Sequence, residues 1–198
     1  MQEPAPMHDP EAALMLDFAG GQEQAFVTLY RSYRDRMVSY CARLLADRAQ
    51  GEEAAQDVFL KLYRARDTYQ VQSRFSTFLY RIATNHCWNL RARLDNKLVR
   101  RGDDSHERSA ASSSSSPATD LANSELRAAL ASALARLPDK QRTALVLVHY
   151  EGLSYKDSAL VLETSEGAIK SLIHRARETM MGELASFVAT DTEVQHAL

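Results

Sequence analysis

The chain has 198 residues, of which 45% are hydrophobic and 25% are charged, a composition that excludes a disordered or fibrous protein. The net charge of −2 is unevenly distributed: residues 1–20 carry −4, residues 21–95 carry +4, and residues 182–198 carry −3. A basic segment of this size permits contact with phosphates, as nucleic-acid binding requires, but it does not demand such contact.

Residues that would support other classes of function are missing or unsuitably spaced. Cys41 and Cys87 lie outside any CxxC or Cys/His cluster, which predicts buried thiols in a reducing cytoplasm and no disulfide or zinc site. The longest aliphatic run, residues 144–148, is too short to span a bilayer, and the N-terminus lacks a secretory pattern, so we expect no membrane insertion. No Gly-rich phosphate loop or catalytic or ligand spacing is present, so we expect no enzyme activity, no metal and no cofactor.

Apolar side chains recur at intervals of three and four in the first half of the chain, which predicts amphipathic helices. A short helical segment follows Pro10, and a longer helix is expected from Ala25 to Gly51, which we expect to break it. A second helix is expected from about 52 to 68 and a third from the N-cap Ser73 onward. No stretch alternates with period two for long enough to predict a strand.

Residues 102–120 lose this periodicity, and the run SAASSSSSPATD has almost nothing to bury. This composition predicts a flexible linker and therefore a domain boundary. The expected organisation is an acidic N-terminal extension at 1–20, a helical domain at 21–95, the linker at 96–122, a second helical domain at 123–182 and a C-terminal tail at 183–198.

Helical periodicity returns in the second domain. A helix from Ser124 is expected to end at Pro138, and a short helix over 141–150 is expected to end at Gly152. Ser154 then has the features of an N-cap, with Asp157 three residues later as a weak capping box. The expected helix runs to about Leu162, with Ala159 and Leu160 facing inward.

A short turn at Glu163 and Thr164 separates that helix from a last one, which Thr164 is expected to cap and whose Ile169 and Ile173 face the core. This is the spacing of a helix-turn-helix, whose second helix presents side chains to the major groove. Its polar and basic positions suit phosphates and base edges. They are Lys170, Ser171, His174, Arg175 and Arg177. The pattern predicts an all-α protein of two small helical domains joined by a flexible linker, the C-terminal one a helix-turn-helix.

At this point the sequence resembles a known family. Residues 137–178, LPDKQRTALVLVHYEGLSYKDSALVLETSEGAIKSLIHRARE, resemble the C-terminal domain of extracytoplasmic-function (ECF) sigma factors almost position for position. The blocks AFVTLYRSYRDRM, GEEAAQDVFLKLYRA and RFSTFLYRIATNHCWN resemble, in the right order, the N-terminal domain of the same group within the sigma-70 family. The resemblance implies a sigma factor that binds core RNA polymerase and directs promoter-specific transcription initiation.

The resemblance also assigns residues to three surfaces. The implied core-binding residues, which would meet the β′ clamp helices, are Glu53, Gln56, Asp57, Phe59, Leu60 and Tyr63. The implied residues for recognising and opening the −10 element are Gln70, Ser73, Arg74, Arg81, Thr84, Asn85 and His86. The implied residues for the −35 element, on the domain that would also meet the β flap, are Thr164, Gly167, Ala168, Lys170, Ser171, His174, Arg175 and Arg177.

Two positions depart from the family pattern. Phe78 stands where many relatives carry Trp, a volume change in a core. Leu172 stands where an Arg is frequent, so one contact to the −35 element is missing. Asn85, in contrast, matches the position that contacts a base flipped out of the stack, which is how promoter opening is achieved.

Two alternatives stay open at this stage. A helix-turn-helix regulator that does not bind core polymerase would explain residues 137–178 but not the match of residues 25–90. A helical adaptor that binds only proteins predicts no salt-dependent affinity for DNA. The family resemblance further implies a cytoplasmic protein and an anti-sigma factor as a partner, although no residue identifies that partner.

Overall fold

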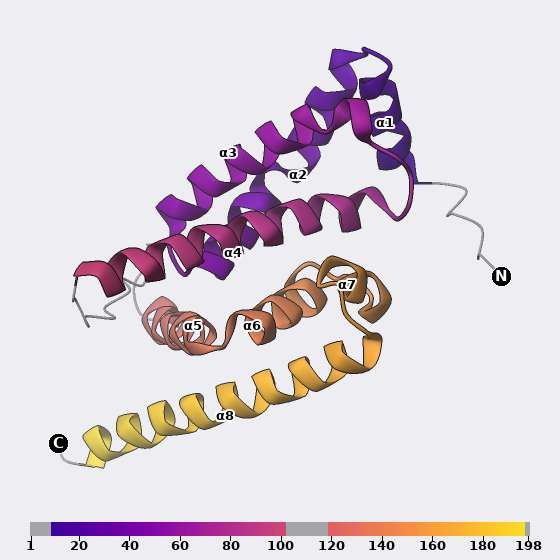
Figure 1. The fold of residues 1–198 in the computed structure, drawn as a ribbon. Coiled ribbons are helices and arrows are strands. Elements are labelled where there is room, and N and C mark those ends of the chain that lie inside the picture. The colour runs from indigo at the N-terminus through magenta and orange to yellow at the C-terminus, as the bar shows by residue number, and fades with distance from the viewer. Residues whose placement is uncertain (1–8, 102–118, 197–198) are drawn as a thin grey trace.

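The computed structural model describes residues 9–101 and 119–196, and the side chains within 9–94 and 126–185. The described residues form helices and no strand, which confirms the all-α prediction. The helices are α1 (Pro10–Ala19), α2 (Glu23–Leu45), α3 (Arg48–Arg64), the 3₁₀ turn η1 (Arg66–Thr68), α4 (Phe75–Arg101), α5 (Thr119–Arg136), α6 (Asp139–Leu145), the π-helical turn η2 (Val146–Tyr150), α7 (Tyr155–Val161) and α8 (Glu166–His196). Figure 1 shows two groups, α1–α4 and α5–α8, with α4 facing α6 and α7.

Helix α1 belongs to the core of the first group, although its residues were predicted as an extension. Met15 and Phe18 are fully buried. One carboxylate oxygen of Asp9 accepts hydrogen bonds from the amides of Glu11 and Ala12 and caps α1. The other accepts a 2.7 Å hydrogen bond from the amide of Phe75, the first residue of α4. Asp9, and not the predicted Ser73, therefore accepts the hydrogen bond of the first amide of α4 and caps that helix.

The prediction that Gly51 breaks a helix is wrong, because Gly51 lies inside α3. Helix α2 ends at Leu45, Ala46 adopts a left-handed conformation with φ of 57°, and Asp47 caps α3. A Cβ on Gly51 would lie 2.6 Å from the Cα and N atoms of Ala42. Gly51 is needed because α2 and α3 approach each other backbone to backbone.

The second group is built around a buried arginine. Arg142 is 1% exposed, and its guanidinium donates hydrogen bonds to the carbonyl oxygens of Leu134, Ala135 and Leu137 at 2.9, 2.5 and 2.7 Å. These carbonyls lie at or just after the end of α5, where the regular backbone hydrogen bonds of a helix run out. The cation therefore fixes the connection from α5 to α6.

The helix-turn-helix is formed by α7 and α8. The Ser154 hydroxyl accepts a hydrogen bond from the Asp157 amide, as predicted, and Ile169 and Ile173 are buried. Two details of the prediction are wrong. Leu160 is 47% exposed because it lies on the outer face of α7. The cap of α8 is Ser165, whose hydroxyl accepts a hydrogen bond from the Ala168 amide.

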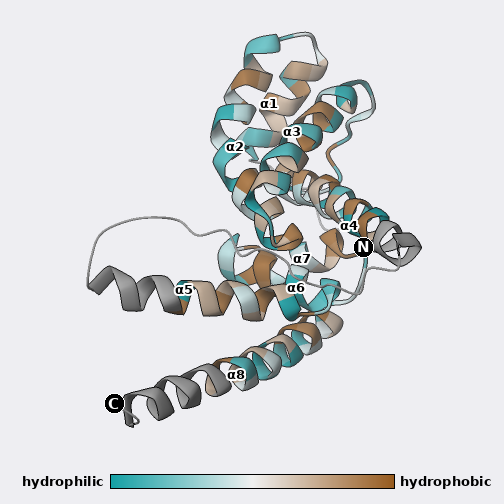
Figure 2. Cartoon of the chain, turned by 90° about the vertical axis from the view of Figure 1, so that its left-hand side faces the viewer, coloured by the Kyte–Doolittle hydropathy of each residue, from teal (hydrophilic) through white to brown (hydrophobic). Residues whose placement is uncertain are grey.

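The predicted linker at 96–122 overlaps the helices at both of its margins. Helix α4 continues to Arg101 and α5 begins at Thr119, while residues 102–118 lie outside the described part of the chain. Figure 2 shows hydrophobic residues gathered where α4, α6 and α7 meet. Within the described residues, none of the helices combines the length and the hydropathy that crossing a bilayer requires.

Candidate nucleic-acid interface

The first half of α8 presents a polar and basic face next to a buried one. Ile169, Ile173 and Ala176 face the core with at most 2% of their surface exposed. The predicted −35 residues all lie in accessible positions: Thr164, Gly167, Lys170, Ser171, His174, Arg175 and Arg177 are exposed, and Ala168 is half-buried. Because the turn before α8 is short, this face begins at the helix N-terminus, as groove recognition requires.

Two of the basic residues on α8 already have neighbours. Arg177 Nη2 lies 2.8 Å from Nε2 of His149 on η2. Burial and the Arg177 cation lower the pKa of His149, which favours a neutral imidazole that accepts this hydrogen bond. His174 lies 3.2 Å from the Glu178 carboxylate. Lys170 and Arg175 make no ion pair with the described side chains, so their charges are available to an anionic partner.

The predicted −10 residues divide into accessible and buried ones. Gln70, Arg74 and Asn85 are exposed, and Ser73 and Arg81 are half-buried. Thr84 is fully buried, and its hydroxyl donates to the Tyr80 carbonyl and lies 2.7 Å from the Tyr40 hydroxyl. Thr84 therefore cannot contact DNA in this structure, because its polar atom is already satisfied within the core.

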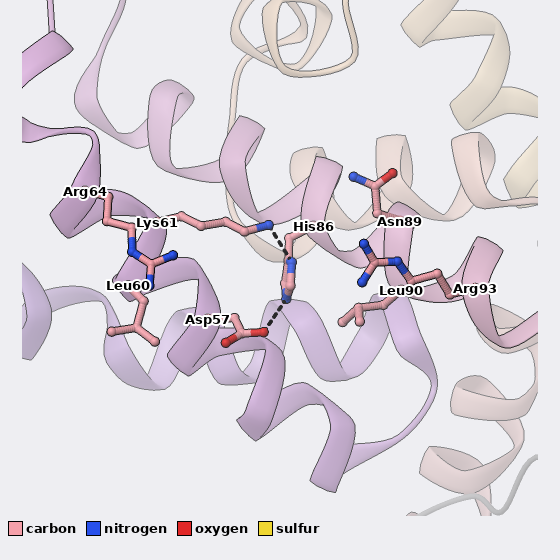
Figure 3. Close-up of a pocket in the computed structure, with 8 residues that line it drawn as sticks. All are labelled: Asp57, Leu60, Lys61, Arg64, His86, Asn89, Leu90 and Arg93. Atoms are coloured by element: carbon pink, nitrogen blue, oxygen red, sulfur yellow. Dashed lines mark hydrogen bonds and ion pairs between the residues drawn. The ribbon is translucent and has the colours of Figure 1, made fainter.

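His86 also points inward, into a cavity of about 290 Å³ between α3 and α4 (Figure 3). Lys61 Nζ lies 2.7 Å from His86 Nδ1, and Asp57 Oδ2 lies 3.3 Å from His86 Nε2. Since an ammonium group can only donate, Nδ1 is the acceptor and the imidazole proton is on Nε2, towards Asp57. Burial and the Lys61 cation lower the pKa of His86, which keeps the ring neutral.

The remaining lining gives this α3–α4 pocket a positive charge. The lining residues are Asp57, Leu60, Lys61, Arg64, His86, Asn89, Leu90 and Arg93. Three cations face one carboxylate, so the pocket can hold an anionic group such as a phosphate or a carboxylate. It also joins two predicted sets, because Asp57 and Leu60 were assigned to polymerase binding and His86 to DNA. Sequence reasoning missed Lys61, Arg64, Asn89 and Arg93, although their spacing of three and four on each helix is a detectable signal.

The residues on α3 that were predicted to bind core polymerase also differ in their exposure to solvent. Glu53, Gln56 and Leu60 are exposed, and Asp57 is half-buried at the pocket. Phe59 is 5% exposed and its ring packs on Tyr30 at 4.8 Å between centroids. Phe59 is therefore a core residue here and not a contact for a partner.

Tyr63 lies at the edge of this surface. Its side chain is 36% exposed, its ring packs against Phe18 and Phe26, and its hydroxyl donates to Glu23. A partner can therefore reach one edge of Tyr63 without disturbing the core.

The two cysteines are both buried in the first helical group, as predicted. The neighbouring Cys87 thiol and burial raise the pKa of Cys41 well above its ordinary value, so the reactive thiolate is disfavoured. Among the described residues, no three His, Cys, Asp or Glu side chains are grouped so that they could hold a metal ion.

Comparison with known families and proteins agrees with this architecture. A profile for sigma-70 region 2 matches residues 29–96, and a profile for sigma-70 region 4 matches residues 127–180. The chain is 33% identical over 173 residues to the RNA polymerase sigma-H factor of Pseudomonas aeruginosa, covering 81% of this chain and 86% of that protein. It is 30% identical over 166 residues to the ECF RNA polymerase sigma-E factor of Escherichia coli, with the same coverage of 81% and 86%.

Solved structures support the fold. The structure of CnrH in complex with the cytosolic domain of CnrY has a TM-score of 0.66 at 23% identity, covering 90% of this chain and 99% of that chain. The sigma factor RpoE from Bartonella quintana, in complex with the anti-sigma factor NepR, has a TM-score of 0.69 at 22% identity, with coverage of 81% and 96%.

Proposed function

Since the chain belongs to the extracytoplasmic-function sigma factors of the sigma-70 family, we propose that it binds core RNA polymerase through α3 and promoter DNA through α4 and α8. One observation carries this division of roles. Matches to regions 2 and 4 occur in order on one chain, and each falls on a helical group with an exposed polar surface. The protein acts by binding alone, in the cytoplasm and without a cofactor, while the polymerase synthesises RNA.

The proposed −35 surface is the exposed face of α8. Lys170 and Arg175 provide long cationic side chains, and Ser171 a hydroxyl, within the first three turns of the helix. Arg and Lys pair with guanine edges and phosphates, and Ser with either. Leu172 packs partly against the core, so it replaces the frequent Arg of relatives with an apolar anchor.

The proposed −10 surface is narrower than the resemblance implied. It comprises Gln70, Ser73 and Arg74 before α4, and Arg81 and Asn85 on it, which are the predicted residues with accessible surface. Asn85 can donate to and accept from the edge of an unpaired base. Each base that stacks or bonds outside the duplex contributes roughly 1–3 kcal/mol, which offsets the cost of strand separation.

The proposed polymerase surface is the exposed side of α3, with Glu53, Gln56 and Leu60 next to the α3–α4 pocket. An exposed leucine with acids and amides beside it suits a groove-binding contact with a polar rim. The carboxylates favour a basic partner helix, whereas the cations of the pocket favour an acidic side chain at its edge.

An anti-sigma factor is the further partner that we propose. The related structure of RpoE is a complex with the anti-sigma factor NepR, and that of CnrH is a complex with the cytosolic domain of CnrY. A partner that covers Leu60 and the partly exposed Tyr63 would block the polymerase surface.

Run-off transcription with purified core polymerase tests the proposal. We expect a specific transcript only when core, this protein and a cognate promoter are all present, with an affinity that falls as salt concentration rises. A regulator that does not bind core would fail to co-elute with core in gel filtration, and that result would reject the proposal.

A further inference from the structure

The α3–α4 pocket carries more positive charge than its own lining neutralises. Lys61 and Arg64 reach it from α3 and Arg93 from α4, and Asp57 is the only carboxylate among its described lining residues (Figure 3). Three cations against one carboxylate leave a net charge of +2 around a cavity of about 290 Å³. Arg64 and Arg93 make no ion pair with another side chain in the described part of the chain, so both guanidinium groups are available to a ligand.

His86 adds a buried donor to this cationic lining. Its side chain is 7% exposed, and because Lys61 donates to Nδ1 at 2.7 Å, the imidazole proton is on Nε2. The Asp57 carboxylate lies 3.3 Å from Nε2, yet among the described residues Nε2 is a buried nitrogen without a hydrogen-bond partner. A buried donor without a partner costs free energy, so a ligand oxygen that accepts from Nε2 is favoured.

Asp57 can make room for such an oxygen atom. Its side chain is 50% exposed, so the carboxylate can rotate into solvent and leave its position beside Nε2 of His86. Asn89, which is also exposed, adds a carboxamide that can donate to the same ligand. The pocket then offers ammonium, guanidinium, imidazole and amide donors to one ligand, which suits a group with several acceptor oxygens, as a phosphate has.

Charge and shape favour a terminal phosphate over the other anionic groups in the cell. A phosphomonoester carries about −1.5 to −2 at neutral pH, which matches the +2 of the lining. A phosphodiester of a nucleic acid and a carboxylate of a protein each carry a single negative charge. A terminal phosphate can also enter a recess end-on, whereas a diester has a sugar on both sides. The volume of about 290 Å³ lies at the lower end of small-ligand pockets, so the ligand is small.

The pocket shares its lining with the surface that we assign to polymerase. Leu60 belongs to both, and Arg64 lies one turn further along α3. The cations of the empty pocket favour an acidic side chain of the polymerase at its edge. A bound phosphate neutralises these cations and adds negative charge beside Leu60, so it opposes that contact.

We propose that the α3–α4 pocket binds inorganic phosphate or the terminal phosphate of a small phosphomonoester, and that an occupied pocket weakens the binding of core polymerase to α3. The binding site is independent of the proposed function. Its effect on polymerase rests on that function, because it requires α3 to be the polymerase surface.

Calorimetric titration of the full chain tests the binding site, with inorganic phosphate, methyl phosphate and dimethyl phosphate as probes. We expect the dianions to bind and dimethyl phosphate, a monoanionic diester, to bind at least about ten-fold more weakly. Binding of methyl phosphate would assign the site to phosphomonoesters, and binding of inorganic phosphate alone would assign it to the free ion. Equal affinity for inorganic and dimethyl phosphate, or no binding, would overturn the proposal.

The double variant Arg64→Gln with Arg93→Gln locates the site. It should bind inorganic phosphate at least about ten-fold more weakly, with an unchanged melting temperature because both side chains are exposed. Arg31→Gln with Arg34→Gln removes the same two charges from exposed positions on α2 and should bind phosphate as the wild type does. Equal affinity in the two double variants would show that the pocket is not the site.

Titration of core polymerase with the labelled full chain tests the effect on polymerase, with and without saturating inorganic phosphate, at an ionic strength held constant with chloride. We expect phosphate to weaken core binding about ten-fold in the wild type and by less than about two-fold in the Arg64 and Arg93 double variant. Core binding that is unaffected by phosphate in the wild type would overturn the proposed regulation. A wild type that does not bind core even without phosphate would instead count against the proposed function, while the calorimetric result would still decide the binding site.

Discussion

The two helices that we assign to DNA, α8 and α4, differ in how many of their sides are packed. In its first half, α8 buries one stripe, formed by Ile169, Ile173 and Ala176, and exposes the rest. Helix α4 is packed against α2 and α3 on one side and against α7 on another. On α8, the residues assigned to DNA are therefore separate from those that stabilise the fold. On α4 the two kinds are adjacent, because the exposed Asn85 lies directly after the buried Thr84.

The largest difference in stability between substitutions on α4 and on α8 is expected at Tyr80. Its ring is fully buried against Tyr40, with 4.9 Å between centroids, and its hydroxyl reaches Glu151. We expect Tyr80→Ala to lower the free energy of unfolding by about 3–5 kcal/mol, measured by urea denaturation, because it leaves a cavity and removes the hydrogen bond to the buried Glu151 carboxylate. Lys170→Ala on α8 is the control and should change it by less than about 0.5 kcal/mol. A small loss for Tyr80→Ala would mean that α4 is not packed on both sides.

The next effect concerns binding and not stability. Replacing Lys170 and Arg175 together by Ala should weaken binding of the holoenzyme to a −35 duplex by about 2–3 kcal/mol. Core binding and thermal stability should stay unchanged, since both side chains lie on the exposed face of α8. Thr179→Ala, further along the same helix, is the matched control in a fluorescence-anisotropy titration. Wild-type affinity in the double variant would remove the −35 assignment.

Neighbouring positions on α4 provide a third test. Asn85→Ala should impair promoter opening, seen as weaker permanganate reactivity of the −10 thymines, with little change in stability because Asn85 is exposed. Thr84→Val should have the opposite profile and cost about 1–2 kcal/mol of stability, because the buried Tyr40 hydroxyl loses its partner. If both variants lose stability to the same extent, Asn85 is a structural residue and not a reader.

The periodicity of apolar residues predicted those features of the fold that depend on a helix burying one face. It located the helices and the buried Ile169 and Ile173, because burial on one side imposes spacings of three and four. It failed at Leu160, since in a helix as short as α7 the boundary of the buried stripe is set by neighbouring helices. The family resemblance assigned residues to three surfaces but did not separate Phe59 and Thr84, which are buried, from their exposed neighbours.

Contacts between residues distant in the chain could not be predicted. Asp9 reaches the amide of Phe75, and Gly51 faces the backbone of Ala42, only after the helices have docked. The positive pocket depends in the same way on the register of α3 against α4, which brings Lys61 to His86. A single sequence carries no local signal for such registers, because each residue is compatible with its own helix in many packings.

The smallest effect expected is the pH dependence caused by His86. Its pKa is lowered by burial and by Lys61, so the ring is neutral in the folded protein while the unfolded chain titrates near pH 6.5. The unfolded state therefore binds more protons as pH falls. The contribution of His86 to stability is complete above about pH 6.5 and is lost as pH falls through the folded pKa.

We expect His86→Gln to flatten the fall in melting temperature that begins near the unfolded histidine pKa of about 6.5 and continues as pH falls towards the lower folded pKa. His149→Gln is the control for the other histidine with a lowered pKa, which lies on η2 and not in the pocket. An unchanged pH profile in His86→Gln would show that protonation of the His86 ring at Nδ1 is not coupled to folding. Water could then replace the hydrogen bond to Lys61 and the contact with Asp57, and substitutions in the pocket between α3 and α4 would change stability as little as those on the exposed face of α8.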